Sequence, residues 1–167
     1  MRNTVFLLMS ILLTGGLMAQ SSPPCNAEFS GQFDFWIGEW DVYQPNGTLA
    51  GHNSIQPLYP GCMLQEKWEG AQGSKGTSLN FYNPTDQKWE QFWVYQNGTT
   101  LHLQGGIQGK SMVMEGESAG QDGKPVMNRI TWTPNADGTV RQHWEFSKDG
   151  GASFQTAFDG LYKPKKA

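Results

Sequence analysis

The stretch QKWEQFWVY, residues 87–95, alternates between two kinds of side chain. In an extended chain successive side chains point to opposite faces, so every second residue shares a face. One face would therefore carry three aromatic rings and one amide, from Trp89, Gln91, Trp93 and Tyr95. The opposite face would carry Lys88, Glu90, Phe92 and Val94. This pattern predicts a strand with one side turned inward.

The same period recurs along the chain, in residues 63–69, 77–82, 111–115, 126–134 and 139–147. Turn sequences such as PNGT at 45–48, QNGT at 96–99 and NADGT at 135–139 separate these runs. Asn-Gly and Asp-Gly are strong hairpin signals, and no segment of helix length has a period of 3.6. We therefore expect an all-β fold of about ten short strands joined by hairpins. A single antiparallel up-and-down barrel is favoured because it closes its own edges, with a β-sandwich as the alternative.

The expected inward faces are aromatic, yet each contains a polar group: Glu66, Gln91, Asn128 and Gln142. A packed core would need a hydrogen-bonding partner for every one of them. Either these groups bond to one another or lie at the rim, or the barrel has a wet or ligand-filled interior. On the second interpretation a small, largely apolar molecule binds inside, with Glu66 as the orienting charge. The predicted lining is Glu66, Trp68, Phe81, Gln91, Trp93, Asn128, Trp132, Gln142 and Trp144.

The N-terminus, MRNTVFLLMSILLTGGLMAQ, joins one basic residue to a short apolar run and small residues. This is typical of a secretory signal peptide, with cleavage expected after Ala19. Residues 20–167 would then form one domain, secreted or periplasmic, with no integral membrane segment. Cys25 and Cys62 are expected to form a disulfide, as a single pair does in exported chains. The oligomeric state is left open.

The segment FDFWIGEWDV, residues 33–42, contains Gly38-Glu39-Trp40, which matches the Gly-x-Trp that opens the first strand of lipocalin-like (calycin) barrels. GCMLQEKWEG, SLNFYNPTDQKWEQFWV, RITWTPNADGTVRQHWEFSKDGG and FDGLYK follow in order. Together they resemble a family of secreted bacterial proteins, a domain of unknown function with a calycin-like barrel. The resemblance covers nearly all of residues 20–167. It implies a short helical turn closing one barrel end with Phe33, Phe35, Trp36 and Trp40, and, by analogy of fold, a small hydrophobic ligand.

Composition and spacing argue against several other classes. A formal net charge of −3 gives no electrostatic footprint for nucleic acid. The three histidines, His52, His102 and His143, have no metal-ligand spacing, so we expect no metal and no resident cofactor. Haem is kept as an alternative, because some barrels resembling this one hold haem through a histidine near the last strand. Here residues 153–165 contain no histidine, which leaves Tyr162 as the candidate ligand.

An enzyme remains an alternative to a binding protein. Glu66 among aromatic side chains could serve as a general acid or base, together with Arg129 or Arg141. By alternation, however, both arginines fall on the faces opposite the tryptophans. No Ser-His-Asp order, phosphate loop or pair of catalytic carboxylates is present. A third alternative is a filled barrel with a structural or interaction role.

Overall fold

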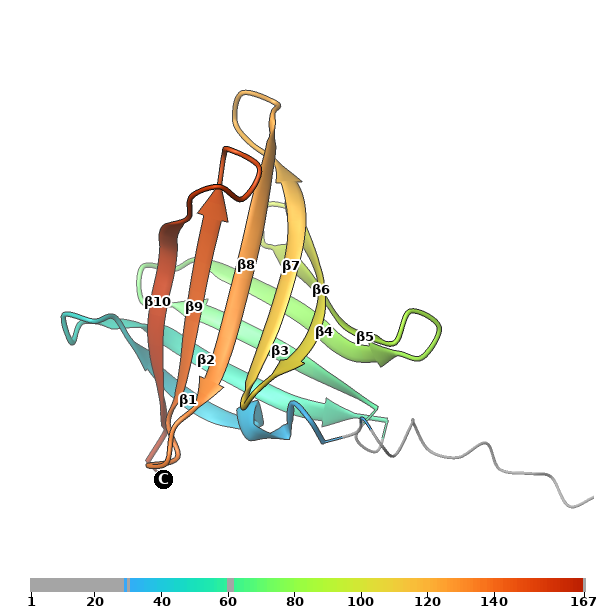
Figure 1. The fold of residues 1–167 in the computed structure, drawn as a ribbon. Helices are drawn as coiled ribbons and strands as arrows, with labels where there is room; N and C mark the ends of the chain where they lie inside the picture. The colour runs from blue at the N-terminus through green and yellow to red at the C-terminus, as the bar shows by residue number, and fades with distance from the viewer. Residues whose placement is uncertain (1–28, 30, 60–61, 167) are drawn as a thin grey trace, which may run out of the picture.

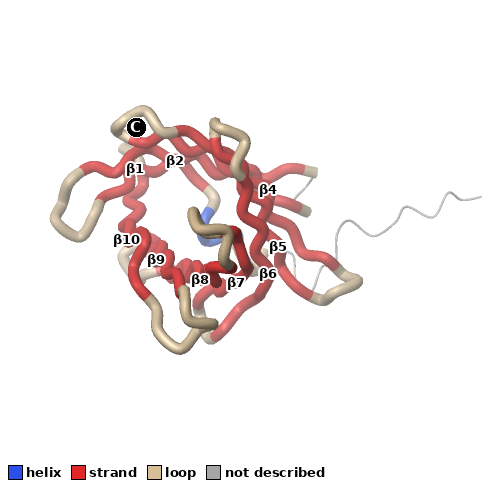
Figure 2. The backbone as a smooth tube through the Cα atoms, turned by 90° about the horizontal axis from the view of Figure 1, so that it is seen from above, coloured by secondary structure: helices blue, strands red, loops and turns tan. Residues whose placement is uncertain are grey.

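The computed structural model describes residues 29, 31–59 and 62–166. Ten antiparallel strands follow one another around a closed barrel, and β1 pairs with β10 to complete it (Figures 1 and 2). One 3-10 turn precedes the first strand. The predicted all-β, up-and-down barrel with a short N-terminal helical turn is confirmed. The elements are η1 (Asp34–Trp36), β1 (Gly38–Tyr43), β2 (Leu49–Leu58), β3 (Met63–Gly70), β4 (Lys75–Asn83), β5 (Lys88–Tyr95), β6 (Thr100–Gln108), β7 (Ser111–Ala119), β8 (Pro125–Pro134), β9 (Val140–Ser147) and β10 (Gln155–Pro164).

Aromatic side chains close the barrel at the end where β1 begins. Phe33 and Trp36 stack with ring centroids 5.0 Å apart, and both are fully buried. Phe33 also meets Trp89 and Trp132 edge-on, at 5.7 and 5.3 Å between centroids. We call these four residues the floor cluster. In the end-on view, the helical turn that carries Trp36 lies inside the outline of the barrel (Figure 2).

The first strand is tied to this floor. The indole nitrogen of Trp40 donates a hydrogen bond of 2.9 Å to the carbonyl oxygen of Trp36. Gly38, the first residue of β1, has a φ of 148°, and a Cβ there would lie 3.3 Å from the Trp40 ring. Glycine suits both conditions, because it has no Cβ and tolerates positive φ. Phe35 packs against the core from a partly buried position, so the aromatic segment closes one barrel end as the resemblance implies.

Two predictions lie outside the described residues. The expected signal peptide falls within residues 1–28, and the expected disulfide uses Cys25. Both stay predictions, as do the boundary at residue 20 and the secreted or periplasmic location. Within the described residues, no helix has the length and apolar character needed to cross a bilayer.

We expect Phe33→Ala to lower the free energy of unfolding by about 3–5 kcal/mol, because it removes the central ring of a closely packed cluster. Phe92→Ala is the matched control, since that ring is 46% exposed on the outer face and should cost less than about 1 kcal/mol. Urea unfolding followed by fluorescence measures both. Equal losses for the two variants would show that the floor cluster does not carry the stability assigned to it.

Candidate functional site

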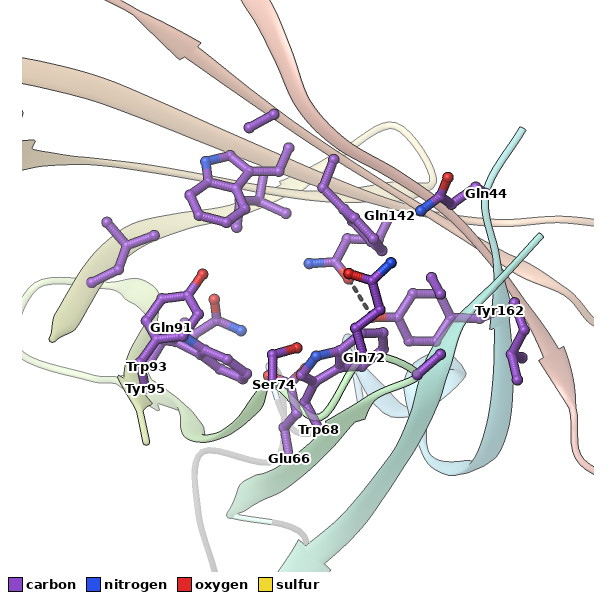
Figure 3. Close-up of a pocket in the computed structure, with 18 of the residues that line it drawn as sticks. Gln44, Glu66, Trp68, Gln72, Ser74, Gln91, Trp93, Tyr95, Gln142 and Tyr162 are labelled. Carbon is purple, nitrogen blue, oxygen red and sulfur yellow. Dashed lines mark hydrogen bonds between the residues drawn. The ribbon is translucent and has the colours of Figure 1, made fainter. Parts of the chain in front are cut away.

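A cavity of about 370 Å³ lies inside the barrel, toward the end opposite the floor cluster. The β1–β2 and β3–β4 turns contribute to its rim, since Thr48 and Gln72 both line it. Residues from the strands line its sides (Figure 3). The lining is Gln44, Thr48, Leu49, Ala50, Glu66, Trp68, Ala71, Gln72, Ser74, Gln91, Trp93, Tyr95, Leu101, Ile130, Gln142, Trp144, Ala157, Phe158 and Tyr162.

Aromatic rings form much of the cavity wall. Trp68 and Phe158 meet edge-on with centroids 6.1 Å apart, and Trp93 meets Tyr95 in the same way at 5.1 Å. Trp93 lies over Gly76, which is diagonally across on β4, where a Cβ would lie 2.2 Å from the indole ring. A close approach of this kind leaves room for glycine alone. The rings therefore offer flat apolar surfaces of defined orientation.

One carboxylate, that of Glu66, faces this cavity, and the residue is only 4% exposed. Its Oε1 accepts a hydrogen bond of 2.7 Å from Asn53 Nδ2, and its Oε2 accepts one of 2.6 Å from Ser78 Oγ. Strand pairing sets this geometry. Glu66 on β3 is directly opposite Ser78 on β4, while Asn53 lies diagonally across on β2, where Ile55 is the residue paired with Glu66. Side chains at such positions point to the same face and lie within reach.

Burial raises the pKa of Glu66 from 4.5 to about 7. Loss of hydration disfavours the charged form, and the hydrogen bonds from Ser78 and Asn53 offset this only in part. Within the described part of the chain, no lysine, arginine or histidine forms an ion pair with this carboxylate. Near neutral pH, both the protonated and the ionised forms are therefore populated. Such a group can either donate or accept a proton.

Hydrogen bonds extend from Glu66 in two directions. On one side Gln91 Nε2 donates to Asn80 Oδ1 over 2.9 Å, and Asn80 Nδ2 donates to Ser78 Oγ over 2.9 Å. Each donation points toward the carboxylate. The buried amides of β4 and β5 thus reach Glu66 through Ser78, and polar groups inside the barrel bond to one another.

On the other side of Glu66, Asn53 Nδ2 also donates to the hydroxyl of Tyr162 over 3.2 Å. That hydroxyl donates in turn to Gln142 Oε1 (Figure 3). Burial, together with the charge of Glu66, raises the pKa of Tyr162 well above its ordinary value. The phenol therefore keeps its proton and remains a donor. Its ring also meets Trp36 edge-on at 6.2 Å, which links the network to the floor cluster.

The structure brings six of the nine predicted lining residues together around the cavity. They are Glu66, Trp68, Gln91, Trp93, Gln142 and Trp144. Asn128 lies behind the wall, where its Oδ1 accepts a hydrogen bond of 3.0 Å from Trp144 Nε1. Trp132 belongs to the floor cluster and is fully buried.

The placement of Phe81 in the lining is corrected. Ser78 and Asn80 are the buried residues of β4, so alternation turns Phe81 to the outer face. Leu79, two residues earlier on that face, is 40% exposed.

Three network residues, Asn53, Ser78 and Asn80, were not predicted. Their signal in the sequence is the same alternation, since Asn53 lies two residues before the buried Ile55.

Neither arginine considered as a catalytic partner reaches Glu66. Arg129 donates to Glu145 Oε2 at 3.0 Å, and Arg141 donates to Asp159 Oδ2 at 2.7 Å. Both pairs lie on the outer face. No group of three potential metal ligands occurs among the described residues. The Tyr162 hydroxyl, the haem ligand considered above, is held between Asn53 and Gln142, and ligation of iron would have to break this arrangement.

Comparison with protein-family models and with curated proteins finds no match to this chain.

We expect wild-type protein to lose stability relative to Glu66→Gln as the pH rises from about 4.5 to about 7. The folded state holds the Glu66 proton more tightly than the unfolded state does. Its stabilising contribution is therefore complete below the unfolded pKa of 4.5 and is lost as the pH passes the folded pKa of about 7. The shift corresponds to about 3 kcal/mol between the two limits. The glutamine variant contains the same other titrating groups. The difference between the two free energies of unfolding therefore excludes their contribution.

Urea unfolding of both proteins at several pH values measures this difference. A difference that stays constant between pH 4.5 and 7 would contradict the burial argument for Glu66.

Proposed function

We propose that this protein binds a small, largely apolar molecule inside its barrel. The observation that carries the proposal is the cavity of about 370 Å³, which lies within the range of known small-molecule sites. Its lining combines aromatic rings with a few polar groups, the usual composition of such sites. The hydrogen-bonded chain from Gln91 to Gln142 holds Glu66 in place, so a ligand would meet a preorganised polar point.

The proposal also includes export of the protein and its membership of a family. The N-terminal sequence of residues 1–19 supports removal of a signal peptide and a secreted or periplasmic location. The barrel, the aromatic floor and the Gly38-Glu39-Trp40 motif support membership of a calycin-like family. A disulfide between Cys25 and Cys62 fits this setting.

Acid–base catalysis in the same cavity is the second candidate. It is favoured by one observation, the pKa of about 7 that burial gives Glu66. A general acid or base works best when its pKa is near the working pH. The nearest partners of Glu66 are an amide and a hydroxyl, which would orient the carboxylate. Turnover with a bell-shaped pH profile that Glu66→Gln abolishes would establish this role.

We expect the neutral dye N-phenyl-1-naphthylamine to bind the wild-type protein with saturable fluorescence enhancement. Ile130→Trp should weaken this binding by about tenfold or more, because the larger ring would occupy the cavity that Ile130 lines. Leu79→Trp introduces the same ring on the outer face and should leave binding unchanged. Fluorescence titration measures all three affinities, and circular dichroism checks that each variant is folded.

The proposal fails if the folded wild-type protein gives no saturable signal. It also fails if both tryptophan variants bind as well as the wild type, since the dye would then lie outside the barrel.

A further inference from the structure

We propose that the ligand of this cavity carries one positive charge, as a protonated amine attached to an aromatic or other apolar body, and that the ammonium group binds Glu66. This inference rests on the proposed binding function and adds the chemical class of the ligand. It follows from the partners of Glu66, from the charges around the cavity and from the aromatic wall.

Glu66 differs from the other carboxylates of low exposure. Three of these carboxylates each pair with a basic side chain. Glu90, whose side chain is 9% exposed, does so at 2.6 Å, Glu145, 20% exposed, at 3.0 Å, and Asp159, 23% exposed, at 2.7 Å. Glu66 is more deeply buried, yet its hydrogen-bond donors are the neutral groups of Asn53 and Ser78. A buried carboxylate without a cation is costly in free energy. A cationic ligand would remove that cost.

Glu66 also keeps the capacity to accept further hydrogen bonds. Each of its two oxygens accepts one hydrogen bond from the described residues, while an ionised carboxylate offers about four acceptor sites. Asn53 Oδ1 is buried and has no donor within the part of the chain that the structure describes. Around Glu66 and Asn53, hydrogen-bond acceptors therefore outnumber the donors that reach them. An ammonium group, which has three donors and no acceptor, complements the imbalance.

The cavity wall favours a cation for a second reason. Among the described residues that line the cavity, Glu66 is the only Asp, Glu, Lys, Arg or His. Trp68 lies two residues along β3 on the same face, and Trp93 is next to Ser78 across the sheet. Aromatic faces attract cations through their quadrupoles, most strongly those of tryptophan. A carboxylate ligand would face Glu66 and these rings without a balancing charge.

The test compares three indoles of similar shape and different charge: tryptamine, tryptophol and indole-3-acetate. Each is titrated as a competitor against bound N-phenyl-1-naphthylamine at about pH 8, where Glu66 is ionised and tryptamine is protonated. We expect tryptamine to bind at least about tenfold more tightly than tryptophol, and indole-3-acetate to bind most weakly. The preference should fall at about pH 5.5, because protonation neutralises Glu66 while tryptamine stays charged.

Glu66→Gln should bind tryptamine and tryptophol equally, as measured by isothermal titration calorimetry, and circular dichroism checks that the variant is folded. Glu69→Gln is the matched control, because this carboxylate is on the same strand but exposed beside Lys75, and it should keep the preference. Equal binding of tryptamine and tryptophol by the wild type overturns the inference, as does a preference that survives in Glu66→Gln or an absence of competition by tryptamine. In each of these cases bound dye leaves the proposed binding function standing. Failure of the wild type to bind the dye overturns both proposals.

Discussion

The burial of the Glu66 carboxylate is the constraint on which the interior of this barrel depends. Two neutral donors hold it, from the strands on either side, and burial raises its pKa to about 7. A charged group in this position requires polar neighbours, because an unsatisfied buried carboxylate would cost several kcal/mol. The inward positions of Asn53, Ser78 and Asn80 answer this requirement. Of the polar residues that interrupt the apolar strands, Glu66, Gln91 and Gln142 thus belong to one network, whereas Asn128 bonds to Trp144 outside it.

The barrel separates two kinds of interior along its axis. At one end the floor cluster packs Phe33 against Trp36, Trp89 and Trp132, with ring centroids 5.0, 5.7 and 5.3 Å apart. Toward the other end, aromatic side chains line a space of about 370 Å³. The polar network crosses the interior between these regions, and Tyr162 touches both. A ligand entering from the hairpin end would therefore meet aromatic walls first and Glu66 at depth.

Alternation was sufficient to predict the strands and most of their faces, because the period of two survives in nearly every strand. The closed barrel was favoured over a sandwich because it leaves no free edge. Alternation also turned Glu66, Gln91 and Gln142 inward, as observed. Alternation does not indicate how far along the barrel axis an inward side chain lies. Trp132 was therefore predicted in the cavity lining, although it belongs to the floor cluster. Phe81 does not line the cavity, because the buried residues of β4 are Ser78 and Asn80 and alternation turns Phe81 outward. The hydrogen bonds of Asn53 depend on register between strands, which a single sequence does not specify.

Glu66 is a buried carboxylate, and burial raises its pKa to about 7. The most direct test is an NMR titration of the glutamate side-chain carboxyl carbons, with the Glu66→Gln spectrum assigning the Glu66 signal. Burial of Glu66 predicts a midpoint at about pH 7 for that signal. A midpoint near the ordinary value of 4.5 would show that the carboxylate is hydrated and not buried.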